Sequence, residues 1–256
     1  MNILLTNDDG IYAEGLLALY KRFAPMHCVT IVAPDRERSA EGHGITLGRK
    51  FSITRVVING RDKGYAVNGT PADCVKLSVM EILDGKPDMV ISGINAGANV
   101  GVNVNYSGTV SAAREAALYG VPAIAASIYG KKTDHYDDAA LFIELLAKIV
   151  LEKGLPFGTF LNVNIPNLPI KKAAGIQISR QGINQFLNYF KINQDLKKCD
   201  YYWQGCDSQN YYDDIEIDGD ALCNNFISIT PIKCDMTDYS LFEDLKKWNI
   251  DYANDP

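Results

Sequence analysis

Two adjacent carboxylates stand at the end of a short apolar run near the N-terminus. Residues 2–5 are rich in strand-forming side chains, and the run ends in Thr-Asn-Asp-Asp-Gly at residues 6–10. Neighbouring carboxylates such as Asp8 and Asp9 repel each other, so one pKa rises unless a cation keeps both groups ionised. A hard divalent cation such as Mg²⁺ or Mn²⁺ would do this. The same residues also form good β-turns, and this stretch taken alone favours the turn.

A polar loop follows the next predicted strand. Residues 28–32 read as a buried strand, and the loop at residues 33–46 carries Ser39 and His43 among several charged side chains. Loops at the carboxyl ends of strands often carry function, although a solvated surface loop also explains this composition. His43 could donate a proton to a leaving group, but a lone histidine in a loop is more often structural.

A glycine- and asparagine-rich segment covers residues 93–109, between a predicted buried strand and a predicted helix. Glycine allows close approach of the backbone to a ligand, so such a loop can wrap a small anion. Ser107, Gly108 and Thr109 fall at the N-terminus of the helix, where free N–H groups and the helix dipole favour phosphate. The first strand–helix turn lacks a GxGxxG pattern, which argues against a dinucleotide-binding fold of the usual kind.

The periodicity of apolar residues predicts alternating strands and helices along the first two thirds of the chain. Strand, helix and strand within 30 residues form a βαβ unit, which requires a parallel sheet. We therefore expect an α/β fold with a Rossmann-like, largely parallel sheet flanked by helices. Strands are predicted at residues 2–5, 28–32, 51–58, 65–67, 87–92, 123–127, 160–165 and 226–230, and helices at residues 13–23, 109–119, 137–153 and 239–248.

A further helix start is predicted at residues 68–73. Thr70 can act as the N-cap, Pro71 takes the first helical position, and Asp73 can complete a capping-box-like arrangement. Capping alone explains this motif, so we assign it no catalytic role.

The composition changes near residue 171. Asn, Gln, Tyr and Asp are frequent in residues 181–220, which predicts arms or hairpins that bind another subunit. A long surface excursion with locally packed rings is the alternative. We expect a single domain over residues 1–256, with a core at about 1–170 and an extension at about 171–256 that holds a hairpin or arm and a terminal helix.

Composition excludes several classes of protein. The net charge of −6 argues against a nucleic-acid-binding surface. Six cysteines without a CxxC pair suit a reducing compartment. No apolar stretch approaches the ~20 residues that a membrane span needs, and the N-terminus lacks the basic region of a signal peptide. We therefore expect a cytoplasmic protein.

Three segments together resemble the SurE family of stationary-phase survival proteins. They are LLTNDDG at residues 4–10, APDRERSAEGHGIT at residues 33–46, and the long segment from PDMVIS to AIAAS at residues 87–127. The shorter motifs VNGTPADCV, LNVNIP and FISITP also fit, in the same order. The resemblance covers nearly the whole chain and is loosest at about residues 171–221.

The resemblance implies a SurE-like fold and a metal-dependent nucleotidase or phosphatase. Nucleoside monophosphates would be hydrolysed at the phosphomonoester, of the 5′- or 3′-nucleotidase type, by a water activated by one divalent metal, Mg²⁺ or Mn²⁺. It also implies a homodimer or homotetramer that exchanges C-terminal elements. The implied site residues are Asp8, Asp9, Ser39 and Asn95 for the metal, Asp8, Asp9 and Asn95 for catalysis, and Ser107, Gly108, Thr109, Asn99 and His43 for substrate. All four metal-binding side chains offer hard oxygen donors, as these cations require.

Two alternatives stay open from the residues themselves. Asp8 or Asp9 could act as a covalent nucleophile, and a trapped phospho-enzyme would favour that reading. The chain could also be a non-catalytic, metal-dependent nucleotide-binding protein. Absence of phosphate release with Mn²⁺ and nucleoside monophosphates would support this second alternative.

Overall fold

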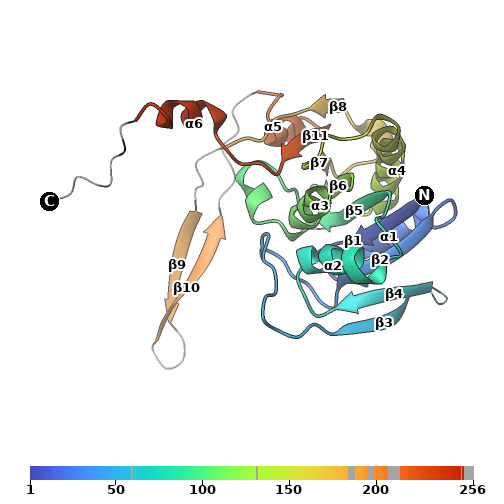
Figure 1. Ribbon diagram of the computed structural model, residues 1–256. Helices are drawn as coiled ribbons and strands as arrows, with labels where there is room; N and C mark the ends of the chain where they lie inside the picture. Colours follow the sequence, from blue (N-terminus) through green and yellow to red (C-terminus); the bar gives the residue numbers. More distant parts are fainter. Residues whose placement is uncertain are drawn as a thin grey trace.

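A twisted, mostly parallel sheet forms the centre of the molecule (Figure 1). The computed structural model describes residues 1–58, 60, 62–130, 132–183, 188–194, 199–206, 214–248 and 250. In these residues the sheet has nine strands, in the order β3-β4-β2-β1-β5-β6-β7-β11-β8, and a separate two-stranded hairpin pairs β9 with β10. The predicted α/β class is therefore confirmed.

The bounds of the elements are as follows. The strands are β1 (Asn2–Thr6), β2 (Cys28–Pro34), β3 (Ile53–Ile58), β4 (Asp62–Val67), β5 (Met89–Ala96), β6 (Ala123–Ile128), β7 (Thr159–Ile165), β8 (Gly175–Ile178), β9 (Asn188–Gln194), β10 (Asp200–Cys206) and β11 (Phe226–Lys233). The helices are α1 (Glu14–Phe23), α2 (Pro71–Leu77), α3 (Gly108–Leu118), α4 (Tyr136–Lys153), α5 (Asp218–Cys223) and α6 (Tyr239–Leu245), with short turns η1 (Ser78–Ile82), η2 (Gly101–Asn105) and η3 (Ile170–Lys172).

The direction of the strands decides where polar side chains gather. Strands β4, β2, β1, β5, β6 and β7 run parallel, whereas β3 is antiparallel to β4 and β11 is antiparallel to β7. The carboxyl ends of β1, β2 and β5 therefore share one edge of the sheet. Ligands of open α/β sheets bind beyond such an edge.

Helices cover both faces of the sheet. Successive residues of a strand point to opposite faces, so Leu5 packs in the cluster that includes α1 and α4, while Leu4 packs with α2 and α3. Both leucines are fully buried. Burial of a leucine side chain contributes about 1.5–3 kcal/mol, and the two clusters together hold the carboxyl edge of β1 in place.

Most predicted elements are present, with shifted ends. Helix α3 begins at Gly108 after an N-cap at Ser107, and Thr70 and Asp73 form the capping box of α2. The predicted loop at residues 93–109 is wrong in its first part, because β5 continues to Ala96. There Asn95 and Ala96 pair with β6 after a register shift, so Asn95 lies within a strand.

The C-terminal part adds elements to the sheet and outside it. Strands β8 and β11 complete the main sheet, and α5 lies beside β11. The β9–β10 hairpin and α6 project from the body (Figure 1). The predicted terminal helix at residues 239–248 ends earlier, at Leu245. The sequence analysis expected a hairpin or arm in this extension without giving the bounds of its strands, and β9 and β10 form a hairpin there. The short elements β8 and α5 were not predicted. Within the described part of the chain, no helix has the length and apolarity needed to cross a membrane.

An ion-pair cluster joins α1 to α4. The Glu144 carboxylate accepts hydrogen bonds from Arg22 and from Lys148, whose Nζ lies 3.0 Å from Oε1. Burial by itself would raise the pKa of Glu144, but the hydrogen bonds and charges of Lys148 and Arg22 outweigh it, so the pKa lies below its ordinary value of 4.5. Both cationic partners stay about half exposed, and the cluster is therefore close to the surface.

We predict that Glu144→Gln destabilises the fold in a pH-dependent way. A carboxyl whose pKa is lowered by folding contributes stability above its unfolded pKa, and this contribution is lost as the pH falls through the folded value. At pH 7 the variant should lose roughly 1–3 kcal/mol, and the loss should shrink below pH 4.5. Urea unfolding at both pH values measures this. The control Glu152→Gln removes an exposed partner of Lys153 and should cost almost nothing. A loss independent of pH would mean that packing, not charge, is affected.

Candidate active site at the carboxyl edge of the sheet

A hollow of about 660 Å³ opens where β1, β2 and β5 end. Six of the predicted site residues line it, and these are Asp8, Asp9, Ser39, Asn95, Asn99 and Ser107. Glu37, Asn103 and Tyr106 line it as well. The structure thus brings the four predicted metal-binding side chains to one place, from the segment after β1, the loop after β2 and the end of β5.

Asp8 is held against the first turn of α3. Its side chain is buried, and its Oδ1 accepts a hydrogen bond from the Thr109 hydroxyl. The helix comes so close that a Cβ on Gly108 would lie 2.6 Å from Cβ of Asp8 and 2.8 Å from Oδ2. Glycine at 108 is therefore required by this contact, and the positive end of the helix dipole favours the carboxylate.

The two aspartates of the hollow have raised pKa values. Burial raises the pKa of Asp8, and hydrogen bonds from Thr109 oppose the rise. Burial also raises the pKa of Asp9, to about 7, with further contributions from the charges of Asp8 and Glu37. Among the described residues that line the hollow there is no lysine or arginine. Both carboxylates therefore lack the positive partner that would keep them ionised.

A divalent cation fits this set of donors. In the described ranges no group of three or more His, Cys, Asp or Glu side chains could hold a metal, so a cation here would also need neutral oxygens. Asn95 donates through Nδ2 to the Gly97 carbonyl at 2.6 Å, which leaves its Oδ1 as an acceptor. Ser39 donates through Oγ to Glu37 Oε1 at 2.6 Å. Two carboxylates, a hydroxyl and an amide oxygen suit Mg²⁺ or Mn²⁺.

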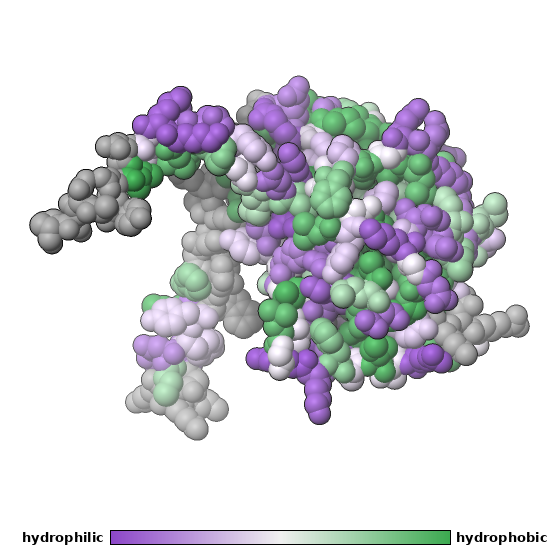
Figure 2. Space-filling view, viewed as in Figure 1, coloured by the Kyte–Doolittle hydropathy of each residue, from purple (hydrophilic) through white to green (hydrophobic). Residues whose placement is uncertain are grey.

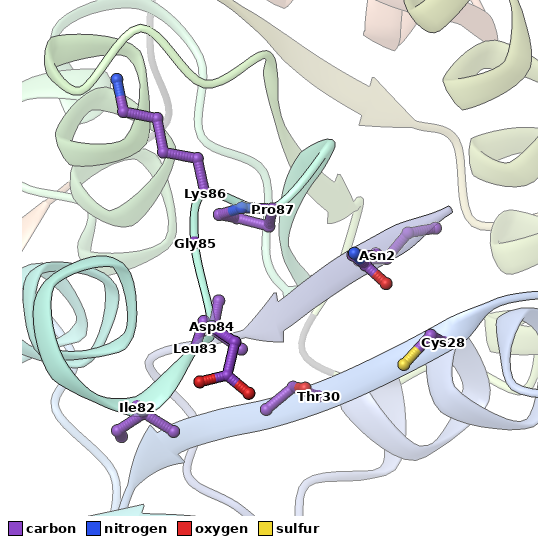
Figure 3. A pocket seen from close by; sticks show the side chains of 10 residues that line it. Asn2, Cys28, Thr30, Ile82, Leu83, Asp84, Gly85, Lys86 and Pro87 are labelled. Atoms are coloured by element: carbon purple, nitrogen blue, oxygen red, sulfur yellow. The ribbon is translucent and has the colours of Figure 1, made fainter.

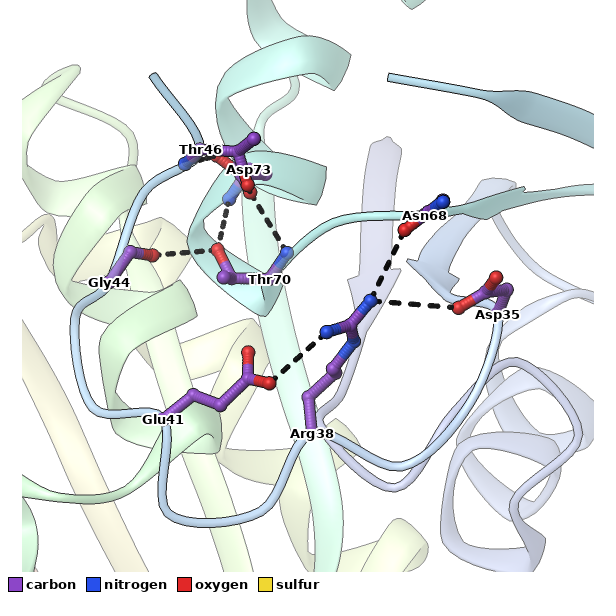
Figure 4. Close-up of polar contacts among 8 residues, drawn as sticks. All are labelled: Asp35, Arg38, Glu41, Gly44, Thr46, Asn68, Thr70 and Asp73. Carbon is purple, nitrogen blue, oxygen red and sulfur yellow. Dashed lines mark hydrogen bonds and ion pairs between the residues drawn. The ribbon is translucent and has the colours of Figure 1, made fainter. Parts of the chain in front are cut away.

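The loop that carries Ser39 is fixed by Arg38 (Figure 4). The Arg38 N–H donates to the Asp8 carbonyl at 2.7 Å. Its guanidinium donates to Glu41 Oε1 at 3.2 Å and to Asn68 Oδ1 at 3.3 Å. The neighbouring residue Ser39 is therefore anchored on one side to the end of β1 and on the other to the end of β4.

The Thr70–Asp73 capping box also holds the loop that carries Ser39. The sequence analysis predicted only the capping role of this motif. Asp73 accepts from the Thr46 N–H at 2.9 Å and from the Thr46 hydroxyl at 2.7 Å, in addition to its bond from Thr70 (Figure 4). The Thr70 hydroxyl donates to the Gly44 carbonyl at 2.7 Å. The motif therefore joins the loop to the start of α2.

Three predicted substrate residues, His43, Gly108 and Thr109, are not among the residues that line the hollow. Gly108 packs against Asp8, as described above. His43 lies with Nε2 2.8 Å from the buried carboxylate of Glu115, and so ties its loop to α3. Thr109 is fully buried, with its hydroxyl engaged by Asp8. The predicted contact of each side chain with substrate stays a prediction.

The loop after β5 is anchored by asparagines that the sequence analysis gave no role. The Asn99 N–H donates to Asn164 Oδ1 at 2.8 Å, and its carbonyl accepts from Asn162 at 2.8 Å and Asn164 at 3.1 Å. The Asn99 side chain donates to the Ser127 hydroxyl at 2.9 Å. The alternation of LNVNIP, with both asparagines on one face of β7, was the available signal.

A second cavity, of about 280 Å³, lies at the opposite edge of the sheet (Figure 3). Asn2 and Cys28 line it at the amino ends of β1 and β2, with Asp84 and Lys86 from the segment before β5. The Lys86 side chain extends away from the other residues, and its amine donates to the Tyr119 carbonyl at 2.9 Å. This cavity lacks paired carboxylates, and we assign no chemistry to it.

The fold and the site define a class of protein. The molecule is an α/β protein with an acidic hollow at the carboxyl edge of a parallel sheet, next to a helix N-terminus, and this edge is where open α/β folds bind their ligands. Residues 3–188 match the family described as Survival protein SurE. The chain belongs to this family.

Similar proteins extend over the same length. A protein named 5′-nucleotidase SurE from Desulfatibacillum aliphaticivorans is 53% identical over 255 residues, covering 98% of this chain and 99% of its own. Another of the same name, from Syntrophobacter fumaroxidans, is 46% identical over 250 residues, covering 98% and 100%. The crystal structure of the SurE protein from Aquifex aeolicus superposes with a TM-score of 0.85 at 36% identity, covering 96% of this chain and 99% of that chain.

We predict that Gly108→Ala destabilises the protein, although alanine has the higher helix propensity. The added Cβ must displace Asp8, and overpacking of this kind costs about 1–3 kcal/mol. Urea unfolding of the variant measures the cost. In an Asp8→Gly background the clash partner is gone, so the same substitution should cost less, as a double-mutant cycle would show. An equal cost in both backgrounds would place the clash elsewhere.

Proposed function

We propose that this chain is a 5′-nucleotidase that hydrolyses the phosphomonoester of nucleoside monophosphates. Membership of the SurE family and the names of the relatives support the reaction. The single observation that carries the proposal for the site is the adjacent pair of buried Asp8 and half-buried Asp9, which have no positive partner among the residues that line the hollow beside α3.

We propose Asp8, Asp9, Ser39 and Asn95 as the side chains that would hold one divalent cation, Mg²⁺ or Mn²⁺. When bound, such an ion polarises a phosphoryl oxygen and lowers the pKa of a coordinated water. The protein's own contribution is orientation, because Thr109 and Gly108 fix Asp8 and the Gly97 carbonyl fixes the Asn95 amide.

The substrate phosphate would bind beside the N-terminus of α3. Ser107 both caps this helix, through a 3.1 Å hydrogen bond from the Val110 N–H, and lines the hollow. Its hydroxyl and the N–H of Gly108 are the donors that we assign to the phosphoryl oxygens. The Tyr106 ring also lines the hollow and is 55% exposed, so it offers the nucleobase an apolar surface for stacking.

We also propose a homodimer or homotetramer formed through the C-terminal projections. On the β9–β10 hairpin, Phe190 and Tyr202 are 63% and 64% exposed. On α6, Leu241 and Phe242 are 46% and 45% exposed. In Figure 2 the helix carries hydrophilic residues on one side and hydrophobic residues on the other. Exposed aromatic and aliphatic side chains on projecting elements are typical of surfaces that a partner covers.

Substitution of the carboxylates tests the reaction. Asp8→Asn and Asp9→Asn should each lower phosphate release from AMP by about 100-fold or more, because a preorganised charge at the reacting group is lost. Without metal both variants should melt at or above the wild type, since carboxylate repulsion is relieved. Both should gain less from added Mn²⁺, because stabilisation by a ligand follows its concentration relative to Kd.

Asp84→Asn, in the second cavity, is the matched control and should behave as the wild type. Equal Mn²⁺ shifts in all proteins would remove Asp8 and Asp9 from the metal site. Normal phosphate release in both variants would refute the mechanism, and a trapped phospho-enzyme would favour a covalent nucleophile instead.

Substitution of exposed apolar residues tests the oligomer. Leu241→Ser with Phe242→Ser should shift the mass measured by light scattering towards the monomer, because the covered apolar area becomes polar. The control pair is Leu145→Ser with Ile149→Ser, on α4, where the side chains are 52% and 54% exposed. The control should leave the mass unchanged. A monomeric wild type, or an equal effect of both pairs, would contradict the proposed interface.

A further inference from the structure

A single peptide unit of the glycine-rich loop is held by the C-terminal segment. The Gly101 N–H donates to Asp218 Oδ2 at 2.8 Å, and the Gly101 carbonyl accepts from Gln181 Nε2 at 2.8 Å. Gly101 has a φ of 58°, a backbone conformation that favours glycine. Both backbone polar groups of this residue thus depend on side chains that lie far along the chain.

Gly101 is the first residue of the turn η2, which leads directly into the proposed phosphate site. The turn carries Asn103, and Tyr106 and Ser107 follow it. All three line the hollow. A shift of Gly101 would therefore move the side chains proposed for the base and the phosphate, while leaving Asp8 and Asp9 on the end of β1.

Both carboxylate oxygens of Asp218 are engaged in hydrogen bonds, and the residue is buried. Its side chain is 1% exposed, and its Oδ1 accepts from the Gly182 N–H at 3.1 Å and from the Gly219 N–H at 2.9 Å. Hydrogen bonds from N–H groups to a buried carboxylate are stronger than those between neutral groups. This one carboxylate therefore joins the loop, the residue Gly182 and the start of α5.

Backbone contacts next to Asp218 also join the two chain segments at the root of the projecting hairpin. Arg180 and Ile217 form a parallel bridge, the Arg180 N–H donates to the Glu216 carbonyl at 2.7 Å, and the Asp218 N–H donates to the Arg180 carbonyl at 3.0 Å. The chain leaves towards β9 just after Gly182 and returns from β10 just before Asp218. The two ends of the arm thus meet at the point where Gly101 is held.

We propose that Asp218 and Gln181 are positioning residues for substrate binding, which fix the turn before Ser107 from the root of the hairpin arm. The assignment of a substrate role rests on the proposed nucleotidase function. The chemistry at the metal is set by other elements, so the effect of these residues falls on KM more than on kcat.

Asp218→Asn tests this inference. The amide cannot accept from both the Gly101 and the Gly182 N–H groups, and loss of hydrogen bonds to a charged group should raise KM for AMP about tenfold. The kcat should stay within about threefold. The matched control is Asp220→Asn, a carboxylate that is also buried on α5 and accepts from the Asp214 N–H at 2.8 Å. It should lower the melting temperature without raising KM.

Hydrogen exchange gives a readout that does not depend on activity. Amides of residues 101–107 should exchange faster in Asp218→Asn than in the wild type, and at the wild-type rate in Asp220→Asn. Gln181→Met keeps the length of the side chain, removes the bond to the Gly101 carbonyl, and should change KM and exchange in the same direction. It takes the place of Asp218→Asn if that variant does not fold.

Equal changes of KM in Asp218→Asn and Asp220→Asn would overturn the inference, as would unchanged exchange over residues 101–107. If the wild type releases no phosphate from AMP, the proposed function fails. Faster exchange confined to Asp218→Asn and Gln181→Met would then still support the fixing of the turn by these two residues, and unchanged exchange would refute it.

Discussion

The burial of the Asp8 carboxylate against the first turn of α3 constrains which residues can surround it. The contact requires glycine at 108, because any side chain there would meet Asp8 at 2.6 Å. Thr109 and the helix dipole compensate part of the buried charge. Asp9 follows immediately and its pKa is also raised, so the proposed cation would compensate both carboxylates.

The neighbouring segments place neutral oxygen atoms beside the two carboxylates. Ser39 comes from the loop after β2 and Asn95 from the end of β5, and each is oriented by a hydrogen bond to a neighbour in its own segment. Other polar residues of the region act as braces. His43 pairs with Glu115, and Asn162 and Asn164 hold the backbone of Asn99. Residue type alone does not distinguish a side chain proposed to bind the metal from one that holds a neighbouring segment in place, since both roles use the same polar atoms.

The parts of the fold and site that follow from local rules could be predicted from the sequence. The capping box at Thr70 is local, and the end of β1 at Thr6 follows from the change from apolar to polar residues. The extension of β5 through Asn95 could not be predicted, because its pairing with β6 resumes only after a register shift. Glu37 was missed as a third carboxylate because only the folded loop brings it to the hollow.

The end of β11 also could not be predicted from the sequence, because it depends on how the neighbouring strands pair. The strand predicted at residues 226–230 stops just before Pro231, and proline has no N–H to donate to a neighbouring strand. In the structure Pro231 lies within β11 and is paired with Leu161 of β7. The pairing with β8 ends at Ile229, so a second neighbour does not require the missing N–H at Pro231. The short β8, which the sequence pattern did not indicate, therefore leaves Pro231 without a partner on that side of β11.

The bond between Gly101 and Asp218 joins residues that are 117 positions apart. During synthesis the sheet from β1 to β7 can form while the later residues have not yet been made, because its βαβ units close over short distances. The turn before Ser107 is held by the contact with Asp218, which cannot form until that distant residue has been made. Closing so long a loop costs conformational entropy, so such contacts form late. Most of the hydrophobic core lies between β1 and β7, so a nascent chain can form this part of the core before the residue that holds its glycine-rich loop has been made.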